Sequence, residues 1–337
     1  MAKWTMKEIA KLANVSQATV SRVINGNKGV NEEAARRVQE VIQSVGFVPN
    51  KAAQTLKHNQ SNIIGLSVTE TYNPYFIEII DTLELEARKN GYSILLHNAK
   101  HNPITEWDNI QNFIARQVDG IIVVPTGDYN LQRISKLPVA VVVMTQNREM
   151  FDSVGLDHMK AGKIAGETFI YAGHQKFGFI GTTPDDKFLG YKSALYENGF
   201  EFDPANYIQL EESSNTNFLM RRDIDAYLNR VGSFDFTCVF TANDVMALEF
   251  IKAAQERQIR IPEDISVIGF DDTYLAKMME ISSIHQPIED MVKMTIEIML
   301  NRIDHEAPPG TEKVQIKLDP ALIERRTSNR KKASSRA

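Results

Sequence analysis

Apolar and polar residues alternate with helical spacing near the N-terminus, where residues 6–25 read MKEIAKLANVSQATVSRVIN. Thr5 and Glu8 have the spacing of a capping box, which predicts that a first helix begins just before residue 6. The apolar residues of this helix share one face: Ile9, Leu12 and Ala13. A tight turn is expected at Asn14, because asparagine tolerates a left-handed backbone.

A second helix is predicted after the turn, with Ser16 as its cap. Its apolar face consists of Val20, Val23 and Ile24. The side chains that point outward are Gln17, Ala18, Thr19, Ser21 and Arg22. Such amide, methyl, hydroxyl and guanidinium groups can read base edges in a major groove and hold the phosphates beside it. We therefore interpret the pair as a helix-turn-helix, with a helical hairpin that merely packs on another surface as the alternative.

A third helix completes this region. Asn31 is placed to cap a helix that runs to Ser44, and Gly46 is placed to end it. The buried stripe of this helix is predicted to be Val38, Val41 and Ile42. Residues 1–47 should thus form an all-α headpiece, close to the lower size limit for independent folding.

Residues 50–59, NKAAQTLKHN, form a linker of good helix formers with Leu56 as its only large apolar side chain. A helix this short is marginal alone, so we expect it to order when it docks on DNA or on a second copy of the chain. A leucine with Ala52 and Ala53 beneath it suits a wedge in a kinked minor groove. A plain flexible tether is the alternative.

After residue 62 the pattern changes to short β-rich runs that alternate with helical stretches, as is typical of parallel sheets. Strands are predicted at Ile63–Val68, Tyr92–His97, Gly120–Val124, Val139–Met144, Phe177–Ile180, Tyr207–Leu210, Cys238–Thr241 and Ser266–Gly269. This arrangement favours two Rossmann-like subdomains over one oversized sheet.

Ligands of open parallel sheets bind beyond the carboxyl ends of the strands, so the residues at those ends are candidates for a binding site. They are Tyr72, Asn73, Tyr75, Phe76, Asn98, Thr145, Gln146, Asp157, Thr183, Asp185, Lys187, Asn243, Asp244, Asp271, Asp272, Thr273 and Gln286. Carboxylates and amides bind hydroxyl groups and aromatic faces stack on sugar rings, which predicts a polyhydroxy ligand. Taken singly, each residue is as easily explained as a helix cap or a turn residue.

The charges of these candidates refine the prediction. Several carboxylates face Lys187, the one clear cation among them, and this balance disfavours a dianionic ligand. We therefore expect a neutral sugar, or a nucleoside, rather than a sugar phosphate.

Composition and charge narrow the function classes. A chain of 337 residues, with 43% hydrophobic and 24% charged residues, suits two or three globular domains. Residues 1–60 hold nine lysines and arginines against four acidic residues, whereas the whole chain has a net charge of −5. A basic headpiece on an acidic body suggests a nucleic-acid partner at one end only.

Several classes of protein are disfavoured by missing signals. The sequence contains neither an apolar run long enough to span a membrane nor a secretory signal, and Cys238 is the single cysteine. We therefore predict a cytoplasmic location. The G-x-S-x-G, H-E-x-x-H and Walker A motifs are missing, and the histidines have no metal-binding spacing. The chain is accordingly predicted not to be an enzyme, and to need no cofactor and no metal.

The segments KEIAKLANVSQATVSRVINGN and GFVPNKAAQTLK resemble the DNA-binding headpiece of the lactose/galactose repressor (LacI/GalR) family. The resemblance runs without a gap from about Met6 to Leu56, and continues through a sugar-binding-like core to about residue 328. It implies that residues 48–60 are the hinge helix, two copies of which enter the minor groove at the operator centre. The DNA-binding residues are then predicted to be Thr5, Ser16, Gln17, Ala18, Thr19, Ser21, Arg22, Asn25, Asn50, Ala53, Gln54 and Leu56.

The core resembles the same family in the segments VGLD, FTANDVMAL and VIGFDD. This implies a periplasmic-binding-protein-like α/β core at residues 61–328, with chain crossings near residues 163, 288 and 320. The predicted division is an N-subdomain of about 61–163 and 289–319, a C-subdomain of about 164–288 and 320–328, and a disordered basic tail at 329–337.

Family positions for the effector match Asp157, Asn243, Asp271 and Gln286. With the strand-end residues Tyr72, Tyr75, Phe76, Asn98 and Lys187, they form the predicted effector site. Lys187 departs from the family pattern, because many members have an arginine three residues before the glycine that is Gly190 here. A lysine lacks the planar fork of arginine, so the usual bidentate clamp on the ligand is not expected.

The expected function is that of a transcriptional repressor that binds a palindromic operator and is controlled by a small ligand, with a sugar inducer favoured. A regulator of the same family that needs a corepressor is the alternative, and a sugar-binding protein without a regulatory role is less favoured. The tail lacks the apolar heptad by which some members form tetramers, so a homodimer is expected.

Overall fold

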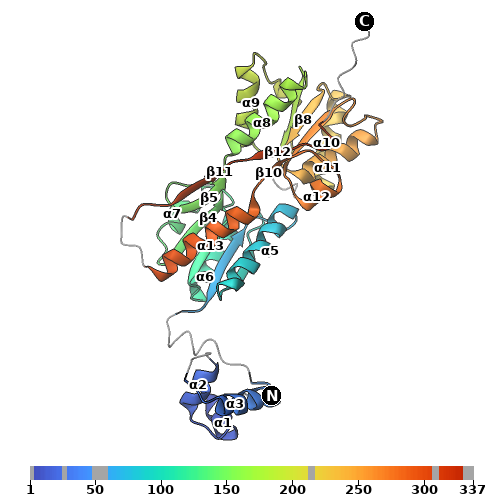
Figure 1. The fold of residues 1–337 in the computed structure, drawn as a ribbon. Coiled ribbons are helices and arrows are strands. Elements are labelled where there is room, and N and C mark those ends of the chain that lie inside the picture. The colour runs from blue at the N-terminus through green and yellow to red at the C-terminus, as the bar shows by residue number, and fades with distance from the viewer. Residues whose placement is uncertain (1–3, 25–28, 48–59, 212–216, 306–310, 329–337) are drawn as a thin grey trace. The chain divides into compact units, whose positions relative to one another are not determined.

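The computed structural model describes residues 4–24, 29–47, 60–211, 217–305 and 311–328, apart from the side chains of residues 217–219. The chain divides into two compact units, Met1–Ser61 and Asn62–Ala337. Figure 1 shows helices in the first unit, the headpiece, and two α/β subdomains in the second, the core.

The headpiece is built from α1 (Met6–Leu12), α2 (Gln17–Ile24) and α3 (Glu32–Val45). The local signals in the sequence behave as predicted. Thr5 and Glu8 form both hydrogen bonds of a capping box, and Asn14 has a φ of +51° in the turn. Ser16 Oγ accepts a hydrogen bond from the backbone N–H of Thr19 at 3.1 Å, which caps α2.

The third helix begins and ends where expected. Asn31 Oδ1 accepts hydrogen bonds from two backbone N–H groups of the first turn, and Gly46 ends α3 with a φ of +61°. The buried core of the headpiece consists of Ile9, Ala10, Ala13, Val20 and Val38. Leu12, which was predicted to lie on the buried face, is 53% exposed instead. Ala10 takes that place, because α2 and α3 pack over the side of α1 that carries Ile9 and Ala13.

Part of the predicted DNA interface falls outside the described residues. These positions are Asn25, Asn50, Ala53, Gln54 and Leu56, with the hinge segment around them and the tail at 329–337.

The N-subdomain contains the first six-stranded sheet. Its strands are β1 (Ile63–Val68), β2 (Ser93–Asn98), β3 (Gly120–Val123), β4 (Ala140–Thr145), β5 (Asp152–Leu156) and β11 (Gln315–Leu318). They are parallel and lie in the order β11-β5-β4-β3-β1-β2. One face is covered by α5 (Pro74–Lys89) and α13 (Ile288–Asp304), which Figure 1 shows side by side. The other face is covered by α6 (Pro103–Ala115) and α7 (Leu131–Ile134).

Strand β1 shows why these strands read as continuous apolar runs. Ile64, Leu66 and Val68 face α5 and α13, so they are fully buried. Gly65 points the other way, where a β-carbon would lie 2.7 Å from the ring of Phe113 in α6. A strand with helices on both faces has no side for solvent, and its sequence loses the polar alternation of a half-exposed strand.

The C-subdomain contains the second six-stranded sheet. Its strands are β6 (Phe177–Gly181), β7 (Tyr207–Gln209), β8 (Cys238–Thr241), β9 (Ser266–Asp271), β10 (Ser283–His285) and β12 (Ala321–Ile323). Their order is β12-β10-β9-β8-β6-β7, with β12 antiparallel to β10 and the other neighbours parallel. The helical elements are α8 (His158–Tyr171), α9 (Asp186–Glu197), η1 (Pro204–Asn206), α10 (Asn217–Val231), α11 (Asp244–Gln255) and α12 (Tyr274–Met278).

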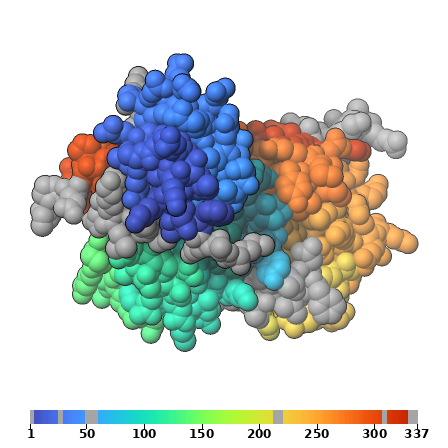
Figure 2. All heavy atoms as spheres, turned by 90° about the horizontal axis from the view of Figure 1, so that it is seen from below, coloured from blue at the N-terminus to red at the C-terminus, as the bar shows by residue number. Residues whose placement is uncertain are grey.

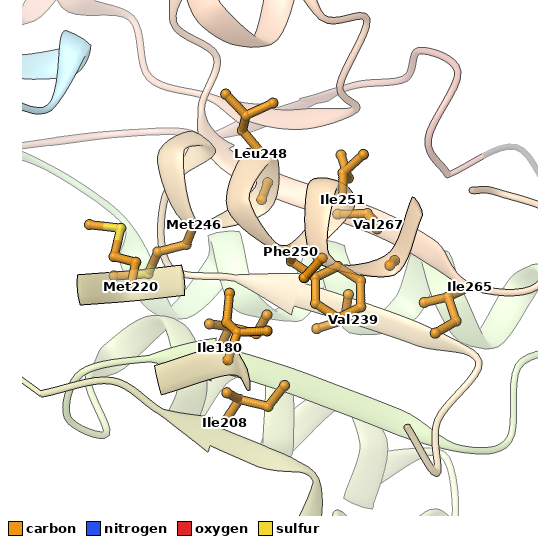
Figure 3. Packing of buried hydrophobic residues seen from close by; sticks show 14 of the residues in the cluster. Ile180, Ile208, Met220, Val239, Met246, Leu248, Phe250, Ile251, Ile265 and Val267 are labelled. Atoms are coloured by element: carbon orange, nitrogen blue, oxygen red, sulfur yellow. The ribbon is translucent and has the colours of Figure 1, made fainter. Parts of the chain in front are cut away.

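Successive residues along these strands point to opposite faces of the sheet, where they pack in two separate hydrophobic cores. Ile180, Val239 and Val267 pack under α10 and α11, and Figure 3 shows Phe250 of α11 reaching toward Val239. Phe179 and Phe240 pack on the opposite face under α8 and α9. Both subdomains are therefore doubly wound, which brings the carboxyl ends of their central strands to one edge of each sheet.

The chain crosses between the subdomains three times. It leaves β5 for α8 at Asp157, leaves β10 for α13 at residues 286–287, and leaves β11 for β12 at residues 319–320. The last two crossings lie near the expected residues, but the first was expected near residue 163 and that position is wrong. Ala161 and Phe169 of α8 are buried in the core of the C-subdomain, so the whole helix belongs there.

The backbones of α8 and α9 approach each other closely because two glycines face the contact. A β-carbon on Gly162 would lie 2.0 Å from the carbonyl oxygen of Lys187, and one on Gly190 would lie 2.0 Å from that of Met159. This contact holds the first turn of α9, and therefore Lys187, against the start of α8.

The subdomains also touch beside α5. In the space-filling view of Figure 2, teal atoms of α5 lie against orange atoms from the region around residues 270–290. The backbone N–H of Tyr274 donates to Glu78 Oε1 at 2.7 Å across this contact. No helix in the described part of the chain is long and apolar enough to cross a membrane.

Candidate functional site

The outer face of α2 carries the side chains predicted to contact DNA. Gln17, Ala18 and Arg22 are exposed, while Thr19 and Ser21 are half-buried. Arg22 forms no ion pair with any described residue, so its guanidinium is available to a partner. The face offers an amide, a methyl group and a fork of N–H donors at helical spacing, which suits base edges in a major groove.

Three polar residues near α2 stabilise the headpiece itself. The Ser16 and Thr19 hydroxyl groups lie 2.9 Å apart and are hydrogen-bonded to each other within the cap of α2. Arg37 of α3 donates from Nε to the carbonyl oxygen of Ala13 at 3.3 Å, which fixes the turn before α2. These contacts hold α2 in place at its N-terminal end.

In the core, four polar side chains join the two subdomains in one buried chain of hydrogen bonds. Tyr75 Oη, at the start of α5, donates to Gln286 Oε1 at 3.0 Å. Gln286 Nε2 donates to Asp271 Oδ1 at 2.6 Å, and Asn73 Nδ2 donates to Asp271 Oδ2 at 3.4 Å. Each of the four residues is less than 10% exposed. Asn73 and Tyr75 follow strand β1 of one subdomain, and Asp271 ends strand β9 of the other.

The backbone of Asp271 is unusual as well. Its φ is +111°, a region that non-glycine residues rarely occupy, and the next residue, Asp272, has a φ of +55°. Such backbone strain is concentrated at functional sites in proteins. Burial, and then the carboxylate of Asp244, raise the pKa of Asp271 well above its usual value. The carboxyl group is therefore poised to interact with polar, uncharged partners.

Lys187 reaches the same cleft from α9, but its charge is already engaged. Its Nζ lies 3.0 Å from Asp185 Oδ2 and 4.7 Å from the ring centre of Phe270. Burial would raise the pKa of Asp185, but Lys187 and the N–H of Phe188 outweigh burial and lower it. The pair is thus ionised and internally neutral.

His158 stands beside this pair on the first turn of α8. Its ring stacks on Phe270, with centroids 5.5 Å apart, and its Nε2 lies 3.2 Å from the carbonyl oxygen of Thr145. Burial, and then the charge of Lys187, lower the pKa of His158 to about 4. The imidazole is therefore neutral near pH 7 and donates from Nε2 to the carbonyl oxygen of Thr145.

Asp157 lies at an open end of the cleft, in a pocket of about 390 Å³ that His158 and Lys187 also line. Its carboxylate caps α8 through the N–H of Lys160 at 2.9 Å, and it pairs with Lys317 Nζ at 2.9 Å. Burial would raise the pKa of Asp157, but these two partners outweigh it and lower the pKa. A ligand would meet an ion pair here, not a lone carboxylate.

The structure brings Tyr75, Lys187, Asp271 and Gln286 together, but it places other predicted residues differently. Tyr72 is 69% exposed, and Phe76 packs edge-on against the ring of Tyr75 at 5.2 Å. Asn98 is engaged with its own subdomain, donating to Thr71 Oγ1 at 3.0 Å and accepting from the N–H of Lys100. Asn243 caps α11 through Oδ1, which accepts from the N–H of Met246 at 2.8 Å.

The two further carboxylates at strand ends have structural partners. Asp244 is fully buried and accepts from the N–H and hydroxyl of Thr273 and from Ser283 Oγ. Asp272 accepts from Arg325 Nη2 at 2.6 Å and lies 3.0 Å from His285 Nδ1. These two carboxylates therefore fit the alternative of a structural cap or turn residue, because they hold the loop after β9 in place.

Sequence reasoning missed two residues of the cleft, His158 and Phe270. Phe270 reads as an ordinary core residue of β9, and His158 reads as the first residue of a helix. The available signal was their position, since each is adjacent to a predicted effector residue, Asp157 or Asp271.

The comparisons with known proteins agree with this geometry in both units. Residues 5–50 match the family model described as bacterial regulatory proteins, lacI family, and residues 167–328 match the periplasmic binding protein-like domain. The ribose operon repressor of Escherichia coli (strain K12) is 28% identical over 334 residues, which cover 95% of this chain and 98% of that protein. The HTH-type transcriptional repressor PurR of Pasteurella multocida (strain Pm70) is 30% identical over 338 residues, covering 96% and 98%.

Solved structures show the same architecture. A complex of the transcriptional regulator CelR with cellobiose has a TM-score of 0.69 at 26% identity, covering 96% of this chain and all of that chain. The lac repressor bound to ONPG in its repressed state has a TM-score of 0.82 at 21% identity, covering 97% and 100%, a likeness that shows the fold. With a headpiece, a two-subdomain core and full-length relatives in agreement, the chain belongs to the lacI family of bacterial regulatory proteins.

Proposed function

We propose that this protein is a transcriptional repressor that binds a palindromic operator as a homodimer and responds to a small ligand in the cleft of the core. One observation carries the proposal. The same polypeptide has an exposed face on α2 that suits base readout and a buried network of hydrogen bonds between two subdomains of its core. Membership of the lacI family, and relatives that are named as repressors, support it. A repressor of this kind is a cytoplasmic protein without catalytic activity.

The proposed DNA-binding residues are those predicted from the sequence: Thr5, Ser16, Gln17, Ala18, Thr19, Ser21, Arg22, Asn25, Asn50, Ala53, Gln54 and Leu56. Within the described residues, Arg22, Gln17 and Ala18 are the ones whose exposed side chains suit base readout. Ser16 and Thr19 are expected to contribute through phosphate contacts near the N-terminus of α2.

The ligand class follows from the charges of the cleft. Lys187 is neutralised by Asp185, His158 is uncharged near pH 7, and Asp157 pairs with Lys317. An anionic ligand would find each nearby cation already paired, whereas hydroxyl groups would find carboxyl, amide and phenol partners at Asp271, Gln286 and Tyr75. We therefore propose a neutral polyhydroxy ligand, a sugar first and a nucleoside second.

The mechanism relies on the contacts that join the subdomains. A ligand that replaces the bond from Asn73 to Asp271, or the bond from Tyr75 to Gln286, changes the relative stability of open and closed cores. If the ligand favours one of these states by ~3 kcal/mol, the ratio of their populations shifts about a hundredfold. The hinge segments of a dimer, residues 48–60 in each copy, would pair in one state and separate in the other.

The test is fluorescence anisotropy with a labelled family-type palindrome, combined with a thermal-shift screen of sugars, sugar phosphates and nucleosides. We expect nanomolar binding to the palindrome, weak binding to shuffled DNA, and release by a neutral sugar that also raises the melting temperature. Tighter DNA binding in the presence of the ligand would identify a corepressor. Equal affinity for the palindrome and for shuffled DNA would contradict a regulatory role.

A further inference from the structure

A second pocket, of about 750 Å³, lies in the C-subdomain along the edge strand β7 and between α9 and α10. Each wall is one face of a single element. Phe188 and Lys192 are one turn apart on α9, Tyr227 and Arg230 are one turn apart on α10, and Tyr207 is on β7. The volume lies in the range of small-molecule sites, and the polar residues of the effector cleft do not line it.

The floor of this β7 pocket is aromatic and fixed. The ring of Phe188 is 4.9 Å from that of Tyr207 and 5.1 Å from that of Phe202, both nearly perpendicular. Phe188, Phe202 and Tyr227 are each less than 10% exposed, so packing holds them in single orientations. Rigid ring faces that still border a cavity are suited to stack on a planar ligand.

Two cationic side chains, Lys192 and Arg230, lie at the rim of the β7 pocket. Among the described residues, neither Lys192 nor Arg230 forms an ion pair, and the guanidinium carbon of Arg230 lies 5.7 Å from the ring centre of Tyr227. The acidic residues at the rim are engaged instead, because Arg222 pairs with Glu211 at 3.0 Å and with Asp223 at 2.9 Å. An anion entering this pocket would therefore meet two available cations.

Tyr207 adds a buried polar group that lacks a partner. Its hydroxyl is buried, and no described residue hydrogen-bonds to it. Burial, and then the carboxylate of Asp185, raise the pKa of this phenol, so it remains a neutral donor. A small shift of the ring toward the pocket would let the hydroxyl donate to a ligand.

From the aromatic floor, the two cations and the unpartnered phenol, we infer that the β7 pocket is a second ligand site, for a small planar anion such as an aryl carboxylate, aryl sulfonate or aryl phosphate. The site is separate from the effector cleft but adjoins it, because residues 184–188 face both. Pro184 and Phe188 line the β7 pocket, while Asp185 and Lys187 line the cleft pocket.

The test uses 8-anilinonaphthalene-1-sulfonate as an anionic aromatic probe and N-phenyl-1-naphthylamine as its neutral counterpart, both followed by fluorescence titration of the full chain. We expect one saturable site for the sulfonate. The double variant Lys192→Met with Arg230→Met should weaken sulfonate binding at least about tenfold, because two charge-assisted contacts are lost. Binding of the neutral amine should change less than about twofold, since the ring contacts remain.

A matched control carries Lys176→Met with Arg326→Met, which removes the same charge from exposed ion pairs elsewhere in the C-subdomain. It should leave both probes unaffected. Hydrogen exchange should show protection by the sulfonate at residues 184–192, 202–211 and 223–230. Failure of the sulfonate to bind, equal affinity in the two double variants, or protection confined to other segments would overturn the inference. These readouts need neither DNA nor an effector, so they are independent of the proposed function.

Discussion

His158 links the chemistry of the cleft to the stability of the fold. Burial, and then Lys187, lower its pKa from 6.5 to about 4 in the folded protein. Between these pH values the unfolded chain binds a proton that the folded chain does not, so the stability present above pH 6.5 is lost as pH falls toward 4. A shift of this size corresponds to roughly 3 kcal/mol.

We predict that His158→Gln flattens the pH dependence of folding, because glutamine does not titrate. The free energy of unfolding, measured by urea titration, should fall between pH 6.5 and pH 4.5 by ~2 kcal/mol more in the wild type than in the variant. His305→Gln, at an exposed position, serves as the control. Parallel curves for wild type and His158→Gln would show that the buried imidazole is not responsible.

Arg22 is the residue of α2 best suited to read a guanine. Its fork of N–H donors matches the two acceptors of guanine in the major groove. We predict that Arg22→Ala weakens binding to the specific palindrome by ~1–3 kcal/mol and weakens binding to random DNA much less. Anisotropy titrations on both DNAs measure the difference, and an equal loss on both would make Arg22 a phosphate contact.

At the residue scale, the sequence predicts those hydrogen bonds and turns whose partners are close together in the sequence. The capping box of Thr5 and Glu8, the Asn31 cap and the Gly46 end are local, and all are confirmed. The partners of the strand-end acids are not local: the bond from Asn73 to Asp271 joins residues 198 positions apart. Spacing alone therefore does not distinguish Asp271, which faces the cleft, from Asp272, which holds Arg325.

At the scale of elements, the contact between α8 and α9 depends on glycine. Gly190→Ala would put a β-carbon 2.0 Å from the carbonyl oxygen of Met159, which is backbone and has no side-chain freedom to yield. We predict a loss of at least ~1–3 kcal/mol from the free energy of unfolding, measured by urea titration, despite the higher helix propensity of alanine.

The same helix provides the control. Ser193→Ala is a change on α9 away from the glycine contact, at an exposed hydrogen bond from the Ser193 hydroxyl to Glu197 Oε1. It should alter stability by less than ~0.5 kcal/mol. If Gly190→Ala proved equally mild, the two backbones would not need to touch, and the position of Lys187 would have another cause.

Element prediction from the sequence is uneven for a physical reason. All eight predicted strands are present, and the central ones, such as β1, β3 and β8, are apolar runs buried on both faces. Strands β5, β10, β11 and β12 are not among the predicted strands. Of these, β11 and β12 lie at sheet edges and are partly exposed, so they do not form clear apolar runs. The first crossing, which the family resemblance implied near residue 163, lies at Asp157, because α8 packs in the core of the C-subdomain.

At the scale of the whole molecule, the buried chain from Tyr75 to Asp271 resists separation of the subdomains. We predict that Tyr75→Phe removes the donor to Gln286 Oε1 and lowers the stability of the closed core by ~1–3 kcal/mol, because a buried acceptor loses its partner. Hydrogen exchange at residues 73–75 and 283–286 should accelerate. Tyr171→Phe, at an exposed position, should leave exchange unchanged, and equal behaviour of both variants would contradict the prediction.

The burial of this hydrogen-bonded network also limits how fast a ligand can bind and leave. Tyr75, Asp271 and Gln286 are 4%, 4% and 2% exposed, so a ligand reaches them only while the subdomains are apart. Association would then level off at the opening rate as ligand concentration rises, and dissociation would wait for the next opening. Domain motions of this kind occupy microseconds to milliseconds. Changes in ligand concentration that are shorter than the interval between openings would therefore not change the occupancy of the site. The regulator would respond to the ligand concentration averaged over that interval.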